Sequence, residues 1–193
     1  MEIRKINIRT ISEKEYSEII RFFPETAEKI KKYRPDDKKR TLAGRFLLKN
    51  MIKEIYGRED FSLVFNENGK PLLDFCFFSI SHSEDVAVCA VSDFPVGADI
   101  QYMGGFVKRK EYMLFTDAES GYVNQHDSEN RFYTLWTMKE AYIKAIGGKI
   151  ADAAKTELVT SDFIIKKTYE NYKFKTEKQE NYVLTVCEKS PEY

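Results

Sequence analysis

The strongest constraint on this chain is an order of elements that occurs twice, a long helix followed by strands. In the first half, apolar residues recur at helical spacing from Leu42 to Ile55, and Gly57 ends the pattern. In the second half, residues 131–146 show the same character and end at Gly147. This repetition predicts two similar α+β halves.

Three strand-like segments follow each long helix, and the last of each set occupies a matching place in its half. The segments are 61–65, 75–80 and 86–92 in the first half, and 163–167, 172–176 and 182–187 in the second. We expect a pseudo-dimer of two halves, residues 1–101 and 102–193, forming one compact unit with the active site in the cleft between them. The alternative is that this common order of elements recurs by accident.

Shorter helices precede each long one. Ser12 and Glu15 have the spacing of a capping box that begins a helix, which fades at Pro24, and a second short helix is expected over residues 26–33. Thr116 and Glu119 repeat the capping-box spacing in the second half. The two halves therefore share their short helices as well.

Composition and charge argue against a nucleic-acid-binding protein and against a membrane protein. The 31 basic and 31 acidic residues give a formal net charge of zero, so no overall basic field favours a nucleic-acid partner. The charged start of the chain and the lack of a long apolar run predict a cytoplasmic protein with no membrane partner. Three cysteines without C-x-x-C spacing predict buried free thiols.

Two separated segments carry the candidate chemistry. We expect Asp99 to lie just past a strand, where the chain leaves the sheet and a carboxylate can face a cleft. Glu140 and Lys144 are four residues apart on the second long helix and so share one face. Taken alone, that pair is typical of a solvated surface ion pair. Together with Asp99, it suits Mg²⁺-assisted chemistry at a phosphate.

His82 lies between Ser81 and Ser83 directly after an apolar run. Such a histidine is most often structural, yet this group also offers several donors to a phosphate. A serine-hydrolase triad fits poorly, because G-x-S-x-G is absent and His82 adjoins both serines in sequence. A zinc site fits poorly because His126 is distant in sequence.

A basic cluster and a tight turn offer further contacts to an anion. Most of the lysines and arginines between residues 29 and 40 are interpreted as solvated helix faces, with two or three contacting a ligand. Lys70 stands between Gly69 and the rigid Pro71, and a lysine in such a turn can be held toward an anion.

Five sequence blocks, in this order, resemble the 4'-phosphopantetheinyl transferases. They are R-T-L-A-G (40–44), N-G-K-P (68–71), S-I-S-H-S (79–83), V-G-A-D-I-Q (96–101) and L-W-T-M-K-E-A-Y-I-K (135–144). The pattern looks like the longer, two-halved class of surfactin-synthetase-activating type. That class folds as a pseudo-dimer with coenzyme A between the halves, which agrees with the repeat described above.

The resemblance implies transfer of the 4'-phosphopantetheine moiety of coenzyme A to a serine of an acyl or peptidyl carrier protein, with release of 3',5'-adenosine bisphosphate. Asp99 and Glu140 would hold Mg²⁺, with Mn²⁺ as the alternative cation, and Lys144 would stabilise the departing phosphate. The base that takes the serine proton would be Glu140 or a water on the metal.

The resemblance also assigns the coenzyme A contacts. Ser81 and His82 would bind its phosphates. Lys29, Arg40 and Lys70, the last held beside Pro71, would hold the 3'-phosphate and the nucleotide end.

One position departs from the pattern of the family. The family commonly has D-I-E, whereas this chain has Asp99, Ile100 and Gln101. Gln101 could contact the metal directly or through water, but it supplies one negative charge fewer. The alternative hypothesis is therefore a coenzyme A-binding module with lost or altered metal-dependent catalysis.

The implied partners are coenzyme A and a carrier protein of fatty-acid, polyketide or non-ribosomal peptide biosynthesis. We expect the carrier to contact the region between residues 103 and 130, where apolar side chains could receive a carrier helix. These side chains are Phe106, Met113, Leu114 and Phe115. Because the two-halved class contains its own pseudo-dimer, we expect a monomer.

Overall fold

The computed structural model describes residues 1–104 and 113–191 of the chain. The chain divides into two compact units, Met1–Asp93 and Phe94–Tyr193. The boundary expected from the sequence, between residues 101 and 102, lies instead inside a strand, Val96–Tyr102, that pairs with the last strand of the chain. The strand belongs to the second unit, where it pairs with the last strand of the chain from Val96 to Tyr102.

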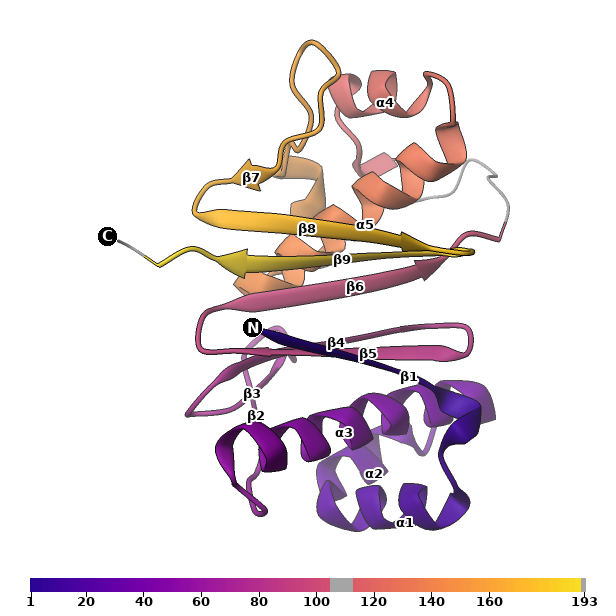
Figure 1. Ribbon diagram of the computed structural model, residues 1–193, viewed down its shortest axis with the longest axis vertical. Coiled ribbons are helices and arrows are strands. Elements are labelled where there is room, and N and C mark those ends of the chain that lie inside the picture. The colour runs from indigo at the N-terminus through magenta and orange to yellow at the C-terminus, as the bar shows by residue number, and fades with distance from the viewer. Residues whose placement is uncertain (105–112, 192–193) are drawn as a thin grey trace. The chain divides into compact units, whose positions relative to one another are not determined.

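The first unit is a small antiparallel sheet with three helices (Figure 1). The sheet has the order β1-β5-β4, and β2 and β3 form a separate short hairpin. Its elements are β1 (Glu2–Asn7), η1 (Ile8–Thr10), α1 (Glu13–Phe22), α2 (Pro24–Ile30), α3 (Pro35–Tyr56), β2 (Val64–Phe65), β3 (Pro71–Leu72), β4 (Phe77–Ser83) and β5 (Val86–Ser92).

The second unit is also α+β, with an antiparallel sheet of the order β6-β9-β8-β7 (Figure 1). Its elements are β6 (Val96–Tyr102), α4 (Asp117–Val123), α5 (Ser128–Ile146), η3 (Ile150–Lys155), β7 (Thr168–Tyr169), β8 (Tyr172–Gln179) and β9 (Tyr182–Lys189). The predicted α+β class is therefore confirmed.

Both units repeat one order of elements, and the repeat is longer than the sequence analysis predicted. In each unit a leading strand, β1 or β6, precedes the long helix and pairs with the last strand, β5 or β9. That last strand pairs in turn with the strand before it, β4 or β8. The leading strand was missed in both halves, since β1 is rich in charged residues and Gly97 in β6 is typical of a turn.

The helix ends follow the capping signals in the sequence. In both predicted capping boxes, the hydroxyl accepts from the backbone N–H three residues on, and the glutamate side chain returns the bond, at Ser12 with Glu15 and at Thr116 with Glu119. Gly57 and Gly147 end α3 and α5 with left-handed backbone, at φ of 65° and 70°. These predictions are confirmed.

Three predicted strands differ from the structure. Residues 163–167 form no strand, because Phe163 adopts a φ of 59° and interrupts the extended run. An isolated bridge between Val159 and Ile165 is formed there instead. The strand β4 continues to Ser83, so Ser81 and His82 lie within it rather than after it. The predicted strand at 61–65 is reduced to β2.

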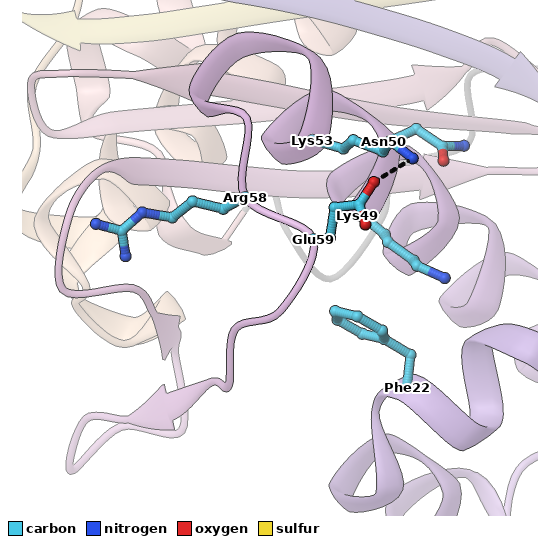
Figure 2. A pocket seen from close by; sticks show the side chains of 6 residues that line it. All are labelled: Phe22, Lys49, Asn50, Lys53, Arg58 and Glu59. Atoms are coloured by element: carbon cyan, nitrogen blue, oxygen red, sulfur yellow. Dashed lines mark ion pairs between the residues drawn. The ribbon is translucent and has the colours of Figure 1, made fainter.

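A cavity of about 190 Å³ lies in the first unit, where α1 ends beside α3 (Figure 2). Its lining includes Phe22, Lys49 and Lys53, but none of the predicted site residues. The ammonium of Lys53 pairs with Glu59 at 2.5 Å, and that of Lys49 lies 4.7 Å from the centre of the Phe22 ring. The ammonium groups of Lys49 and Lys53 therefore both contact groups of the protein itself.

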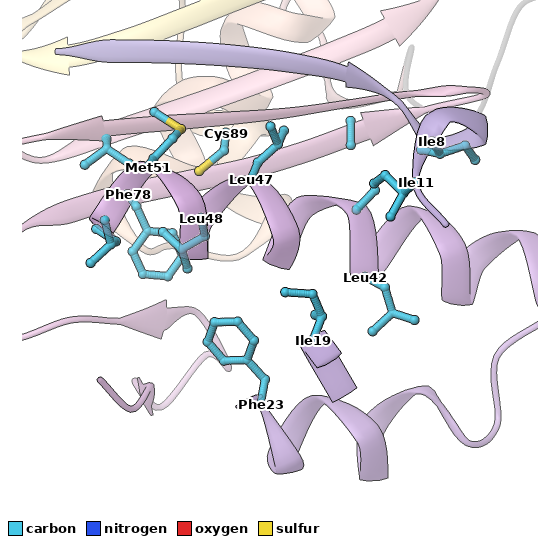
Figure 3. Packing of buried hydrophobic residues seen from close by; sticks show 14 of the residues in the cluster. Ile8, Ile11, Ile19, Phe23, Leu42, Leu47, Leu48, Met51, Phe78 and Cys89 are labelled. Atoms are coloured by element: carbon cyan, nitrogen blue, oxygen red, sulfur yellow. The ribbon is translucent and has the colours of Figure 1, made fainter. Parts of the chain in front are cut away.

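The core of the first unit lies between α3 and the sheet, with α1 packed on the other side of α3 (Figure 3). Leu48 and Met51 are fully buried there, beside Phe23, Phe78 and Cys89. All three cysteines are buried free thiols, as predicted. No helix among the described residues combines the length and apolar character that crossing a membrane requires.

Replacing Leu48 with alanine tests the position of this core. We expect Leu48→Ala to lower the free energy of unfolding by about 2–5 kcal/mol, because a fully buried side chain would leave a cavity. Ile20→Ala on α1, where the side chain is 37% exposed, serves as the control and should cost under about 1 kcal/mol. Urea unfolding measures both, and equal losses would contradict the packing described.

Candidate functional site

The candidate site begins with a close approach of β6 to α5. A Cβ atom on Gly97 would overlap the carbonyl oxygen of Ala141 and lie 2.6 Å from the backbone nitrogen of Ala145. Only glycine therefore allows the backbone of β6 to lie directly against α5. Since side chains alternate along a strand, Asp99 and Gln101 point to the same face as Gly97, toward the helix.

Asp99 lies in the middle of β6, opposite Thr185 of β9, and is 1% exposed. The prediction that Asp99 lies just past a strand, where the chain leaves the sheet, is therefore wrong. The sequence around Pro95 and Gly97 resembles a turn, but Gly97 serves the contact with the helix. What brings Asp99 to the site is the packing of α5 on the sheet.

Four of the predicted site residues meet at this contact. The ammonium of Lys144 donates to Asp99 Oδ1 at 2.5 Å and lies 3.8 Å from Glu140 Oε2. The side-chain amide of Gln101 donates to Asp99 Oδ2 at 3.0 Å. The side chains of Glu140 and Lys144 are 23% and 29% exposed, so they form a half-buried cluster rather than a solvated surface pair.

The carboxylates of Asp99 and Glu140 stabilise the protonated form of Lys144. Burial lowers the pKa of Lys144, but the carboxylates of Asp99 and Glu140 outweigh it, so the pKa stands above its ordinary value. The amine therefore stays protonated near neutral pH. Both carboxylates therefore lie close to the same ammonium group, that of Lys144.

The same carboxylates suit a divalent cation when other oxygens complete the coordination. Mg²⁺ is commonly held by one or two carboxylates together with water and substrate phosphates. Within residues 1–104 and 113–191, no three His, Cys, Asp or Glu side chains form a metal-ligand group. Asp99 and Glu140 supply two carboxylates of this kind, and the ammonium of Lys144 contacts both. Gln101 contacts Asp99 through its amide nitrogen.

Ser81 and His82 belong to the first unit and point to opposite faces of β4, because side chains alternate along a strand. His82 pairs with Ala87, a member of the core beneath α3, whereas Ser81 pairs with Val88. Ser81 is buried and His82 is exposed. Both residues lie close to the end of β4, at Ser83.

Arg40 lies at that end of β4. Its Nε donates to the carbonyl oxygen of Glu84 at 2.8 Å, in the turn that follows Ser83. Its Nη1 donates to Asp37 at 2.9 Å. The structure therefore brings Arg40 beside the turn that joins β4 to β5.

Lys70, Pro71 and Lys29 lie on other elements of the first unit. Gly69, at a φ of 79°, closes the turn before Lys70, and burial lowers the pKa of Lys70 to about 8. Pro71 begins β3, paired with Phe65. Lys29 is exposed in the last turn of α2.

Two residues that shape the site, Gly97 and Lys139, were not predicted from the sequence to do so. Gly97 stands two residues before Asp99 in an apolar run, and this glycine-x-aspartate spacing was the available signal. Lys139 precedes Glu140 but points elsewhere. It is 0% exposed and pairs with Glu119, which is also 0% exposed. No charge pattern in the sequence distinguishes it from a surface lysine.

Comparison with known proteins identifies relatives of this chain. A sequence model of the 4'-phosphopantetheinyl transferase superfamily matches residues 95–187, which include β6, α5 and β9. The 4'-phosphopantetheinyl transferase gsp of Aneurinibacillus migulanus is 36% identical over 117 residues, 58% of this chain and 49% of that protein. The 4'-phosphopantetheinyl transferase Sfp of Bacillus subtilis is 32% identical over 149 residues, 72% of this chain and 66% of that protein.

A third relative is also named a 4'-phosphopantetheinyl transferase. The 4'-phosphopantetheinyl transferase HetI of a Nostoc species is 30% identical over 145 residues, 65% of this chain and 59% of that protein. The chain thus spans about half to two thirds of the length of these three relatives. The alternative of a binding module without catalysis gains no support from their names.

Gly97→Ala tests the contact that forms the site. We expect a loss of about 1–3 kcal/mol in unfolding free energy, because the methyl group would push α5 away from β6. Gly104→Ala is the matched control, since among the described residues a Cβ there would meet only the Tyr102 ring, at 3.2 Å. An unfolding midpoint for Gly97→Ala equal to that of the original chain would contradict the geometry described.

Lys144→Met tests the electrostatics of the cluster. Because the folded-state pKa of Lys144 is raised, its stabilising contribution is complete below about pH 10 and is lost as pH rises through the folded-state value. The difference in unfolding free energy between the original chain and Lys144→Met should therefore shrink at high pH. Urea unfolding at a series of pH values measures it, and a difference that grew with pH would contradict the assignment.

Proposed function

The chain belongs to the 4'-phosphopantetheinyl transferase superfamily, and from this premise we propose that it loads carrier proteins. In this proposal it transfers the 4'-phosphopantetheine moiety of coenzyme A to a serine of an acyl or peptidyl carrier protein. The products are the holo carrier protein and 3',5'-adenosine bisphosphate. The observation that carries the proposal is the contact of Lys144 on α5 with both Glu140, on the same helix, and Asp99 of β6.

The reaction places specific demands on these side chains. The serine oxygen forms a bond to the phosphorus that carries the pantetheine arm, and the bond from that phosphorus to the bridging pyrophosphate oxygen breaks. Negative charge grows on the departing bisphosphate as this happens. We assign the stabilisation of that charge to Lys144, and its protonated, half-buried ammonium supports this role.

A divalent cation held by Asp99 and Glu140, Mg²⁺ in the first instance, would neutralise the pyrophosphate when bound. The proton of the serine passes to a base within this cluster. Glu140 is the more accessible carboxylate, since its side chain is 23% exposed and that of Asp99 is 2% exposed. Both oxygens of Asp99 accept hydrogen bonds, from Lys144 and Gln101. We therefore assign the proton to Glu140.

The coenzyme A contacts are part of the same proposal. Arg40, beside the turn that follows β4, and His82, exposed near the end of that strand, are assigned to its phosphates together with Ser81. Lys70, beside Pro71, and Lys29 are assigned to the 3'-phosphate and the nucleotide end. The exposed fraction of Lys29 and the rigid turn before Lys70 support these assignments.

The two-halved arrangement, with the active site between the halves, also stands as a proposal. It is supported by the repeated order of a leading strand, a long helix and two further paired strands within each unit.

The carrier protein is proposed to contact the region between residues 103 and 130, and the enzyme to act as a monomer in the cytoplasm. Met113 is 85% exposed and precedes α4, which supports this surface. Leu114 and Phe115 are partly buried against the core of the second unit. Phe106 lies outside the described residues.

A carrier-loading assay tests the proposal. The purified chain, incubated with coenzyme A, Mg²⁺ and an apo carrier protein, should add one phosphopantetheine mass to the carrier, measured by mass spectrometry. Glu140→Gln should lower kcat by about 10²-fold or more, because it removes both a metal ligand and the proposed base. Glu129→Gln, the same substitution in the first turn of α5, is the control and should retain activity.

Absence of a mass gain with several carriers and with both Mg²⁺ and Mn²⁺ would contradict the proposed transfer. Gln101→Glu should tighten the binding of Mg²⁺, because it adds a negative charge beside Asp99. Transfer that arises only in Gln101→Glu would instead favour the coenzyme A-binding module.

A further inference from the structure

Lys139 lies inside the segment that carries Glu140 and Lys144, yet its side chain is fully buried away from them. Successive residues of a helix are turned by about 100°, so Lys139 projects from a different side of α5 than Glu140. A buried lysine is costly unless its charge is paired and each N–H group has an acceptor. The surroundings of Lys139 meet both conditions.

Three acceptors surround the ammonium of Lys139. Its Nζ lies 2.8 Å from Glu119 Oε2, and it donates to the carbonyl oxygens of Ala153 at 2.6 Å and Thr156 at 2.5 Å. An ammonium has three donors, so the number of acceptors matches. Ala153 and Thr156 lie in and just after η3, so the contact joins α5 to the end of that helix.

Glu119 is equally constrained. It is the capping-box residue of α4, where its Oε2 accepts from the backbone N–H of Thr116 at 2.9 Å. Its Oε1 accepts from the backbone N–H of Leu158 at 2.9 Å. One buried ion pair therefore ties α4, η3 and the chain after η3 to a single position on α5.

We propose that Lys139 is a positioning residue for the candidate active site, fixing α5 so that Glu140 and Lys144 face Asp99. This inference rests on the proposed function for its catalytic consequence. An apolar residue could fill the same space, but it would leave the rotation and the axial position of α5 less determined. The three directed hydrogen bonds of Lys139 define both.

The proposal is tested with a pair of variants that separates stability from positioning. Lys139→Met retains most of the side-chain length but leaves Glu119 charged and buried, so the midpoint of thermal unfolding should fall. Adding Glu119→Gln removes that charge and keeps one of the two oxygens that accept from backbone N–H groups, so the midpoint should recover in part. In the double variant, kcat should remain about 10-fold to 100-fold below the original chain, with the KM for coenzyme A nearly unchanged.

A second measurement does not depend on catalysis. The coupling between Asp99 and Lys144 is obtained from the unfolding of Asp99→Asn, Lys144→Met and their combination. We expect this coupling to be lost in the background of the Lys139→Met and Glu119→Gln double variant. Leu135→Ala, a buried apolar truncation on the same helix, is the matched control and should lower the unfolding midpoint while retaining the coupling.

The outcomes are distinguishable. A double variant that recovers its unfolding midpoint and also shows the original kcat and the original coupling would overturn the proposal. If the original chain loads no carrier protein, the proposed function fails, and the coupling measurement alone then decides the role of Lys139. Loss of coupling in the double variant but not in Leu135→Ala supports it.

Discussion

The candidate site depends on the direct backbone contact between β6 and α5 at Gly97. Because Gly97 has no side chain, the strand can lie against the carbonyl oxygen of Ala141 and the backbone nitrogen of Ala145. Asp99, two residues along the same face, then reaches the ammonium of Lys144 at 2.5 Å. A methyl group at residue 97 would push β6 away from α5, and this would separate Asp99 from Lys144.

The helix that carries Glu140 is held on several sides by polar contacts that are otherwise uncommon in a buried core. Lys139 binds Glu119 and two carbonyl groups on one side. On the side facing the sheet, the Thr137 hydroxyl lies 2.8 Å from that of Thr185, which lies 2.8 Å from that of Thr176. Directed bonds of this kind fix a helix more precisely than apolar packing does, which suits an element that must present Glu140 and Lys144 in a defined geometry.

The sequence predicted those parts of the structure that rest on local signals. The two capping boxes, the glycine ends of α3 and α5, and the shared face of Glu140 and Lys144 all follow from residues within one or two turns. By contrast, β1 pairs with β5 and β6 pairs with β9, although the paired strands are far apart in the chain. The residues near each strand do not indicate its partner. Asp99 was misplaced for the same reason, because Gly97 is explained only by the helix packed against it. The burial of Lys139 likewise depends on Glu119 and on the carbonyl groups near η3.

We propose that Asp99 and Glu140 together bind one divalent cation. Diffraction data collected at the manganese absorption edge, from crystals of the chain grown with coenzyme A and Mn²⁺, test this pair of ligands. We expect an anomalous peak within coordination distance of a carboxylate oxygen from each of Asp99 and Glu140, with a coenzyme A phosphate as a further ligand. A peak that contacts neither carboxylate, while the Lys144 ammonium still holds Asp99, would contradict it.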